Sequence, residues 1–286
     1  MGIKKAVFPI AGLGTRFLPI TKSIPKEMLP ILNKPIIEWT IKEAVDSGIE
    51  TAIMITSKYK SAIENYFDSF TELEETLKSQ NKLELLEEIK SIEEMVKLVS
   101  IRQRKTLGLG HAVLCSKIAV GSDDFVVVLP DDVIFGEKPV IRQLIEVYEE
   151  TKNPVIAIKE VPWEDVKSYG IVKVREVSCR LYIVEDLIEK PQKEEAPSNL
   201  AIIGRYILTN DIFDKLEKTP PGKNGEIQLT DALKMLIKDR PIYAYKFEGC
   251  HFDCGQKLGF ILANLFIALR DKELREPILN FLRENT

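Results

Sequence analysis

Residues 8–30 read FPIAGLGTRFLPITKSIPKEMLP, and this segment carries the strongest evidence on the fold of the chain. Residues 3–10, which overlap its start, are β-branched, apolar and aromatic, and they predict a short buried parallel strand. Gly12 and Gly14 follow the strand, and glycines can adopt positive φ and bring backbone N–H groups close to an anion. The segment therefore predicts a strand that leads into a phosphate-binding loop.

Three cations follow the glycines, at Arg16, Lys22 and Lys26. Their spacing is too wide for one helix face, and the prolines around them predict an extended loop that surrounds its ligand. Two well-known phosphate loops do not fit, because the dinucleotide fingerprint needs a glycine where Phe17 stands and no Gly-Lys-Ser/Thr of a Walker A loop is present. A glycine turn that merely joins a strand to a helix is the alternative, but it does not explain a motif of this length.

Positive charge is a local property of this chain. Up to Lys34 the only acidic residue is Glu27, whereas the whole chain has 40 Lys and Arg against 44 Asp and Glu. This balance excludes nucleic acid as the main partner, because binding the phosphate backbone needs a broad basic surface. We also expect no membrane contact, because no apolar run approaches the ~18–20 residues of a spanning helix and the N-terminus lacks a signal-peptide pattern.

Composition is that of an ordinary globular protein. A length of 286 residues with 45% hydrophobic content suits one large α/β domain or two small ones. The four cysteines include one Cys-x-x-x-Cys pair, at Cys250 and Cys254, but with only two histidines and no second pair we expect no zinc site. We interpret them as reduced, structural cysteines of a cytoplasmic protein.

The first half of the chain alternates between apolar, β-rich segments and segments with helical spacing. Strands are predicted at residues 6–10, 51–56, 99–102, 125–129 and 155–159. Helices are predicted at residues 36–45, 112–119 and 140–148. This is the βαβ rhythm of a doubly wound parallel sheet, in which ligands bind outside the carboxyl ends of the strands.

The remaining segments interrupt or follow this rhythm. Residues 71–97 are rich in Glu and Lys with leucines at helical spacing, and they predict one or two amphipathic helices in a solvated insertion. Beyond Pro162, shorter strands predict a smaller, mixed β part of the chain. They are expected at residues 171–174, 181–188 and 200–208. Residues 257–282 are helical and amphipathic enough to cover the sheet or to form a subunit contact.

Aspartates at two places in the chain are candidates for a metal site. Strand 125–129 delivers Asp131 and Asp132 at its carboxyl end, and Asp253 follows a strand-like segment far along the chain. Mg²⁺ prefers hard oxygen ligands, commonly one or two carboxylates together with substrate phosphates. The alternatives are a helix N-cap or turn for the first pair and a turn before the last helices for Asp253. Proximity of Asp131 to Asp253 would favour the metal site over these local roles.

Residues 8–30 resemble the signature loop of the sugar-nucleotide pyrophosphorylases, and the long form ending in KEMLP resembles the bacterial UTP–glucose-1-phosphate uridylyltransferases. The resemblance covers nearly the whole chain. It includes residues 197–206 and 225–231, which distinguish this branch from thymidylyl and adenylyl relatives. Two positions depart from the family pattern, because Ile10 stands where alanine is more frequent and Asp132 where asparagine is frequent.

The resemblance implies a fold and a set of sites. The fold is a Rossmann-like, doubly wound mixed sheet forming one nucleotidyltransferase domain over residues 1–286, with a nucleotide-binding part at about 1–160, a sugar-binding part at about 161–256 and C-terminal helices at about 257–286. The implied catalytic residues are Arg16, Lys26 and Lys190. The implied nucleotide-binding residues are Ala11, Gly12, Gly14, Thr15, Glu27, Gln103 and Gly108. The implied sugar-binding residues are Asp132, Gly170, Glu189 and Gly204, and the implied Mg²⁺ ligands are Asp131 and Asp253.

The implied reaction joins UTP and glucose 1-phosphate to give UDP-glucose and pyrophosphate. It needs no general base, because a sugar phosphate with a second pKa of about 6 is largely dianionic at neutral pH. We therefore interpret His111 as structural. The resemblance also implies a homodimer or homotetramer. Two alternatives remain open at this point: a thymidylyltransferase or other relative that uses a different base or sugar, and a catalytically silent subunit that binds sugar nucleotides.

Overall fold

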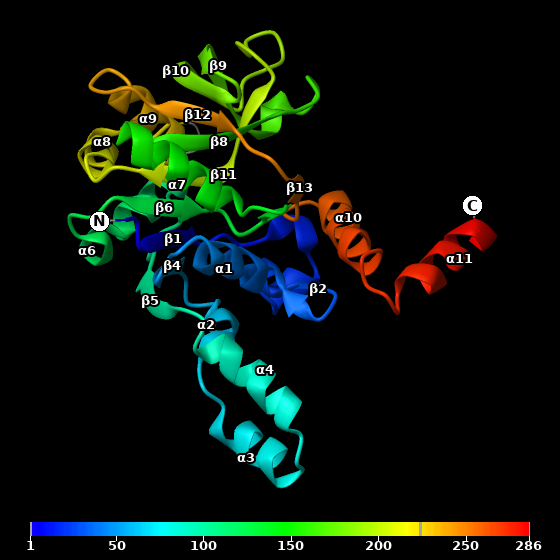
Figure 1. Ribbon diagram of the computed structural model, residues 1–286. Helices are drawn as coiled ribbons and strands as arrows, with labels where there is room; N and C mark the ends of the chain where they lie inside the picture. Colours follow the sequence, from blue (N-terminus) through cyan, green and yellow to red (C-terminus); the bar gives the residue numbers. More distant parts are fainter. Residues whose placement is uncertain (1, 223–224, 286) are drawn as a thin grey trace.

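A computed structural model describes residues 2–222 and 225–285 of the chain (Figure 1). The large sheet contains β1 (Lys5–Pro9), β4 (Thr51–Thr56), β5 (Lys97–Arg102), β6 (Phe125–Val128), β8 (Val155–Glu160), β9 (Gly170–Ser178), β10 (Leu181–Glu189), β11 (Leu200–Leu208) and β12 (Tyr243–Lys246). Their order across the sheet is β5-β4-β1-β6-β11-β8-β12-β10-β9. Every strand predicted from the sequence is present, and the α/β prediction is confirmed.

The sheet is parallel on one side and mixed on the other. β5, β4, β1 and β6 run parallel to one another, as the βαβ rhythm predicted. β11 is antiparallel to both of its main neighbours, β6 and β8. We had expected residues 200–208 in the smaller β part, but all but the first residue of β11 are buried, and the strand lies in the middle of the large sheet. The two predicted parts of the chain therefore share one sheet.

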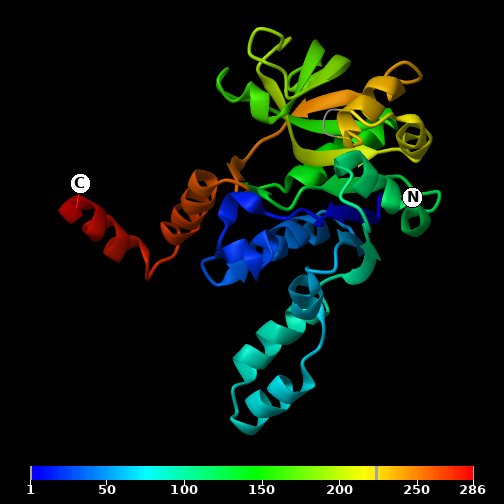
Figure 2. The same ribbon diagram turned by 180° about the vertical axis from the view of Figure 1, so that it is seen from behind.

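Helices cover both faces of the sheet (Figures 1 and 2). One face packs against α1 (Ile36–Asp46) and α7 (Val140–Thr151), and the other packs against α5 (Leu109–Cys115), α8 (Ile212–Lys218) and α9 (Leu229–Leu236). Alternate residues of β1 enter the two hydrophobic layers, as expected for a strand buried on both faces. The predicted helix 112–119 is two helices, α5 and α6 (Lys117–Val120), which meet at Ser116.

Two pairs of helices extend from this body (Figure 1). α3 (Thr71–Ser79) and α4 (Leu83–Glu93) follow α2 (Ser61–Phe67) and form a projecting hairpin, which confirms the predicted helical insertion. α10 (Lys257–Ala268) packs on a small cluster that includes Ile31 and Val133, and α11 (Arg275–Asn285) buries no residue. Of the two roles expected for the C-terminal helices, the structure does not show the covering of the large sheet, and the subunit contact stays a prediction. Within the described ranges, no helix has the length and apolar character required to cross a bilayer.

Two small sheets lie beside the large one. β2 (Pro30–Ile31) pairs with β3 (Lys34–Pro35), and β7 (Asp132–Phe135) pairs with β13 (Cys250–Asp253). The second ribbon is antiparallel and sets Asp132 directly opposite Asp253. Because β7 begins just beyond the carboxyl end of β6, this ribbon brings the distant segment 250–253 to the edge where ligands are expected.

Candidate active site

A cleft of about 580 Å³ opens at the end of β1 and is here called the nucleotide compartment. A second hollow of about 260 Å³, here called the sugar compartment, lies between β6, β9, β10 and β11. Arg16, Leu109, Lys190 and Glu226 line both. The two hollows are therefore adjoining compartments of one cleft.

Most of the predicted site residues meet in this cleft. The nucleotide compartment is lined by Ala11, Gly12, Gly14, Thr15, Arg16, Lys26, Gln103, Gly108 and Lys190. The sugar compartment is lined by Arg16, Asp131, Asp132, Gly170, Glu189, Lys190 and Asp253. Glu27 and Gly204 line neither compartment. Residues from both ends of the chain thus come together as the resemblance implied, with these two exceptions.

The glycine loop is more compact than predicted. Instead of an extended segment it forms three single 3₁₀ turns, at Thr15–Phe17, Ile20–Lys22 and Lys26–Met28. The proline φ of about −65° that suggested extension also suits a 3₁₀ turn. Gly14 has a φ of 67° and accepts a hydrogen bond from Thr21 Oγ1 at 2.8 Å, whereas Gly12 does not have positive φ. Only the second glycine therefore needs its left-handed conformation.

Glu27 lies outside the lining of the nucleotide compartment, and its implied part in nucleotide binding stays a prediction. Its side chain is 1% exposed and its Oε2 lies 2.6 Å from Nζ of Lys60, which is itself buried. Burial raises the pKa of Glu27 and lowers the pKa of Lys60, because it disfavours the charged form of each, while their contact opposes both shifts. The pair joins the loop to the start of α2.

Gln103 and Gly108 lie on one side of the nucleotide compartment. Gln103 Nε2 donates to the carbonyl of Gly108 at 3.2 Å and lies 2.9 Å from Nδ1 of His111. Burial lowers the pKa of His111, which keeps the imidazole neutral and suits the structural interpretation of this residue. Gly108 has a φ of 92°, and a Cβ there would lie 2.8 Å from Glu226 Cβ. The turn is therefore packed closely against the 225–231 segment, a contact between two motifs far apart in the sequence.

Asp131 and Asp253 lie on the same side of Gly255. A Cβ added to Gly255 would lie 2.6 Å from Asp131 Oδ2 and 2.9 Å from Asp253 Oδ1. The backbone joins the two segments as well, because Cys254 N donates to the carbonyl of Asp131 at 2.7 Å. No three His, Cys, Asp or Glu side chains of the described residues form a complete metal cage. Two carboxylates that leave ligand positions for phosphate oxygens are the donor set that suits Mg²⁺.

The carboxylates differ in electrostatic environment. Burial would raise the pKa of Asp131, but Lys26, whose Nζ lies 2.5 Å from Asp131 Oδ2, lowers it. Burial alone would lower the pKa of Lys26. The negative charges of Asp131 and Glu27 outweigh this effect, so the pKa of Lys26 is raised. Burial and then the charge of Asp132 raise the pKa of Asp253. The edge therefore concentrates negative charge that a cation would stabilise, with Lys26 in contact with one of its carboxylates.

The sugar compartment is built from the ends of β9 and β10. A Cβ on Gly170 would lie 3.2 to 3.4 Å from Ile202 Cδ1, Glu189 Oε2 and Thr230 Oγ1, so the glycine keeps this space open. Glu189 Oε2 accepts a hydrogen bond from Thr230 Oγ1 at 2.5 Å, which orients the carboxylate. Lys190 follows at the boundary of the two compartments, with Nζ 3.5 Å from Glu189 Oε1.

The structure explains the glycine at position 204 in a way that the sequence did not suggest. It is buried in β11, and its N–H donates to Asp132 Oδ2 at 3.1 Å. A Cβ at this position would lie 2.4 Å from Leu129 Cβ and 2.5 Å from Asp132 Oδ2. Glycine is needed here because β11 approaches the Leu129–Asp132 turn so closely, and the implied contact of Gly204 with the sugar ring stays a prediction.

We expect Gly204→Ala to lower the free energy of unfolding by about 1–3 kcal/mol, because the added methyl group overpacks a buried contact. Urea denaturation measures this change. Gly2→Ala is the matched control, since a Cβ there meets no heavy atom within 4 Å, and its effect should stay within about 0.5 kcal/mol. A Gly204→Ala protein as stable as the control would mean that β11 moves away from the turn without cost.

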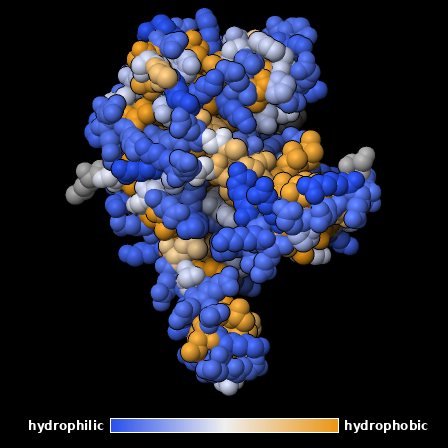
Figure 3. Space-filling view, turned by 45° about the vertical axis from the view of Figure 1, so that its right-hand side comes forward, coloured by the Kyte–Doolittle hydropathy of each residue, from blue (hydrophilic) through white to orange (hydrophobic). Residues whose placement is uncertain are grey.

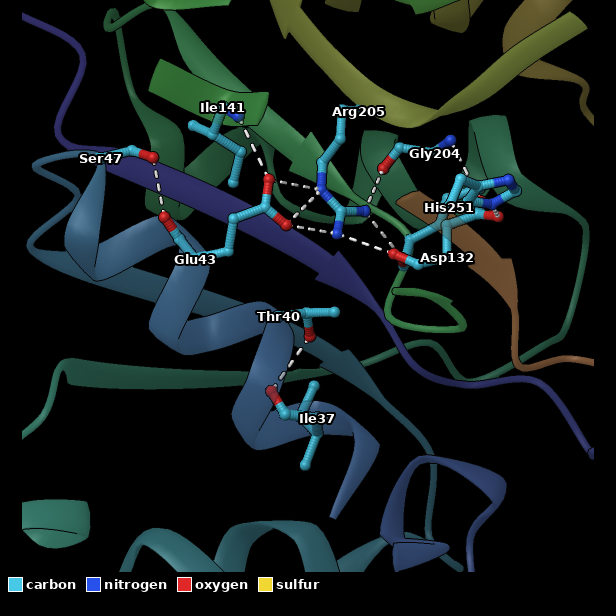
Figure 4. A network of polar contacts seen from close by, with 10 residues as sticks. Ile37, Thr40, Glu43, Ser47, Asp132, Ile141, Gly204, Arg205 and His251 are labelled. Carbon is cyan, nitrogen blue, oxygen red and sulfur yellow. Dashed lines mark hydrogen bonds and ion pairs between the residues drawn. The ribbon is translucent and has the colours of Figure 1, made fainter. Parts of the chain in front are cut away.

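Three residues of the site were missed at the sequence level. Glu226 lines both compartments, Thr230 orients Glu189, and Arg205 is fully buried and bonds the backbone of the Leu129–Asp132 turn (Figure 4). All three lie within the segments 197–206 and 225–231 that carried the resemblance. The signal was therefore present as a motif, but single-residue chemistry did not assign these side chains a role.

The chain is similar in sequence to a family of known proteins. The sequence profile described as nucleotidyl transferase matches residues 5–269. The UTP–glucose-1-phosphate uridylyltransferase of Bacillus subtilis (strain 168) is 48% identical over 280 residues, which cover 98% of this chain and 96% of that protein.

Solved structures agree with the sequence comparison. The UTP-bound UGPase from Acinetobacter baumannii superposes with a TM-score of 0.91 at 45% identity, covering 99% of this chain and all of that chain. A UDP-glucose pyrophosphorylase complexed with UDP-glucose superposes with a TM-score of 0.85 at 43% identity, covering 94% of this chain and all of that chain. On the evidence of the profile, of relatives identical at nearly half of their positions and of a shared fold, the chain belongs to the nucleotidyl transferase family.

Proposed function

We propose that this protein is a UTP–glucose-1-phosphate uridylyltransferase, which makes UDP-glucose and pyrophosphate from UTP and glucose 1-phosphate. The observation that carries the proposal is the position of Lys190, at the boundary between a compartment lined by the glycine loop and one lined by Gly170 and Glu189. A cation at that boundary can hold the phosphate of a ligand in the sugar compartment next to the phosphates of a ligand in the nucleotide compartment. Structures similar to this chain contain UTP in one case and UDP-glucose in another, which supports the same pair of compartments.

The nucleotide compartment binds UTP. Gln103 presents an amide, which can donate and accept as the edge of uracil requires, and the backbone at Ala11 and Gly12 completes the recognition of the base. Arg16 and Lys26 bind the triphosphate and stabilise the negative charge that moves onto the leaving pyrophosphate. Gly14 and Thr15 contribute backbone N–H groups of the loop to the phosphates.

The sugar compartment binds and orients the nucleophile. Glu189 accepts hydrogen bonds from sugar hydroxyls, and Gly170 leaves room for the ring against the backbone. Lys190 holds the sugar phosphate so that one of its oxygens attacks the α-phosphorus of UTP in line with the leaving pyrophosphate. The sugar phosphate is already dianionic, so no side chain has to remove a proton.

The ligands proposed for a divalent ion, Mg²⁺, are Asp131 and Asp253. When bound, the ion would neutralise charge on the α-phosphate and the sugar phosphate and bring them together. Lys26 Nζ contacts Asp131 in the structure, so the ammonium would turn toward the triphosphate when a metal ion takes this carboxylate. Asp132 is directed at Gly204 and His251, with Oδ1 2.6 Å from His251 Nε2, and we assign it to the wall of the sugar compartment.

Pyrophosphate release tests this function. The purified protein is given Mg²⁺, glucose 1-phosphate and each nucleoside triphosphate in turn, and each component is then omitted. We expect release only when UTP, the sugar phosphate and the metal are all present. Release with dTTP or with another sugar phosphate would keep the mechanism and change the specificity. Tight UTP binding without any release would instead indicate a silent sugar-nucleotide-binding subunit.

We propose a single nucleotidyltransferase domain in a cytoplasmic homodimer or homotetramer. The shared sheet supports one domain, and the four cysteines are all free, as in a reducing compartment. Large apolar side chains exposed on the C-terminal helices support self-association, because such patches are normally covered by a partner (Figure 3). They include Leu258, Ile261, Leu262 and Phe281.

A further inference from the structure

Arg205 is the largest fully buried side chain described in the structure, and all of its N–H groups have acceptors (Figure 4). Its Nη1 donates to the carbonyls of Leu129 at 3.1 Å and Gly204 at 2.9 Å. Its Nη2 donates to the carbonyl of Asp132 at 2.8 Å. Nε and Nη2 also reach the two carboxylate oxygens of Glu43 at distances from 2.6 to 3.2 Å.

Two of the three carbonyls that Arg205 binds, those of Leu129 and Asp132, are the ends of the turn that carries Asp131. Within the turn, Asp132 N donates to the carbonyl of Leu129 at 3.2 Å. Leu129 N in turn donates to the carbonyl of Gly204, on β11, at 2.8 Å. Between these ends, the Asp131 carbonyl is held by Cys254 N. The backbone of the turn is therefore restrained along its length, while the Asp131 carboxylate points into the sugar compartment.

Glu43 holds the guanidinium from the opposite side. Its side chain is 7% exposed, and Oε1 also accepts a hydrogen bond from Ile141 N at the start of α7 at 3.2 Å. A buried ion pair seldom adds much net stability, because desolvation of two charges offsets their attraction. A rigid, planar guanidinium, however, can bind one carboxylate and three carbonyls at once, which no other side chain can do. Its geometry points to an orienting role.

We infer that Arg205, held by Glu43, is a positioning residue for the metal site. Its guanidinium fixes the Leu129–Asp132 turn so that the carboxylate of Asp131 stays beside that of Asp253 across Gly255. This inference rests on the proposed function for the metal ligands Asp131 and Asp253 and for the identity of the reaction. Arg205 itself lines neither compartment, so it acts through Asp131 and does not touch a substrate.

The test compares Arg205→Lys with the wild-type protein by two readouts. Mn²⁺ binding to the protein with UTP, but without sugar phosphate, is followed by electron paramagnetic resonance, and the Mg²⁺ concentration for half-maximal UDP-glucose formation is measured separately. Lysine keeps the charge but cannot span the same acceptors. We expect both metal constants to weaken by roughly 10- to 100-fold, with the KM for UTP at saturating metal changed far less.

Arg240→Lys is the matched control, because Arg240 bonds Asn153, Asp211 and the carbonyl of Lys152, away from the cleft. It should leave both metal constants unchanged. If Arg205→Lys does not fold, Glu43→Gln takes its place. This variant keeps the guanidinium of Arg205 but replaces its carboxylate partner with an amide that matches it poorly. We then expect both metal constants to weaken, by less than in Arg205→Lys. A folded variant with wild-type Mn²⁺ binding and only a lower unfolding temperature would overturn the inference. Because Mn²⁺ binding needs no turnover, it reports on Arg205 even if the wild-type protein forms no UDP-glucose.

Discussion

Asp131→Asn should lower the kcat for UDP-glucose formation by on the order of 10²- to 10³-fold, the range found when a group that stabilises transition-state charge is removed. The amide has the shape of the carboxylate but no negative charge, so it would bind a divalent ion weakly. It would also leave Lys26 without the carboxylate that lies 2.5 Å from its ammonium. Steady-state kinetics at saturating UTP and glucose 1-phosphate, over a series of Mg²⁺ concentrations, measures the effect.

The comparison needs a variant with the same chemical change outside the cleft. Asp68→Asn provides it, because Asp68 is exposed at the end of α2 and lines neither compartment. Its kcat and its Mg²⁺ dependence should equal those of the wild-type protein. Nearly normal turnover of Asp131→Asn at ordinary Mg²⁺ concentrations would show that Asp131 serves only as the partner of Lys26, and the proposed metal site would have to be abandoned.

Lys190→Ala should separate the two substrates. A charge-assisted hydrogen bond to phosphate contributes about 1.5–3 kcal/mol, so we expect kcat/KM for glucose 1-phosphate to fall roughly 10- to 150-fold. The Kd for UTP should change far less, because Arg16, Lys26 and the glycine loop remain in the nucleotide compartment. Varying glucose 1-phosphate at saturating UTP, together with calorimetric titration of UTP alone, gives both values.

Lys193→Ala is the control for this experiment. Lys193 lies three positions further along the chain, is exposed, and forms an ion pair with Glu164 at 3.0 Å outside the cleft. Its removal should leave both substrates unaffected. If Lys190→Ala weakened UTP binding and sugar-phosphate use equally, Lys190 would belong to the nucleotide compartment, and its assignment to the nucleophile would be wrong.

Much of the architecture could be predicted because its signals are local. The strand that ends at Pro9, the helix beginning at Ile36 and the paired helices between Thr71 and Glu93 each follow from periodicity within a single segment. The family resemblance implied that the carboxylates Asp131 and Asp253 are neighbours, and the structure sets both beside Gly255. The pairing itself was beyond local reasoning, since β7 and β13 are more than one hundred residues apart.

The contacts that the sequence did not suggest share one cause, which is packing between segments that are distant in the sequence. Glu27 pairs with Lys60 from the start of α2, and Gly204 is glycine because a turn from another part of the chain lies against it. Neither contact leaves a trace in the neighbouring residues.

The amino-acid sequence by itself therefore determined the strand and helix pattern, the glycine loop and the types of side chain available for chemistry, because these depend on residues close together in the chain. Only the tertiary structure decided that β11 enters the middle of the sheet, which side chains reach the cleft, and that Arg205 binds the turn carrying Asp131. Burial and long-range hydrogen bonds exist only after distant segments have packed together, and a residue's role in the site depends on them.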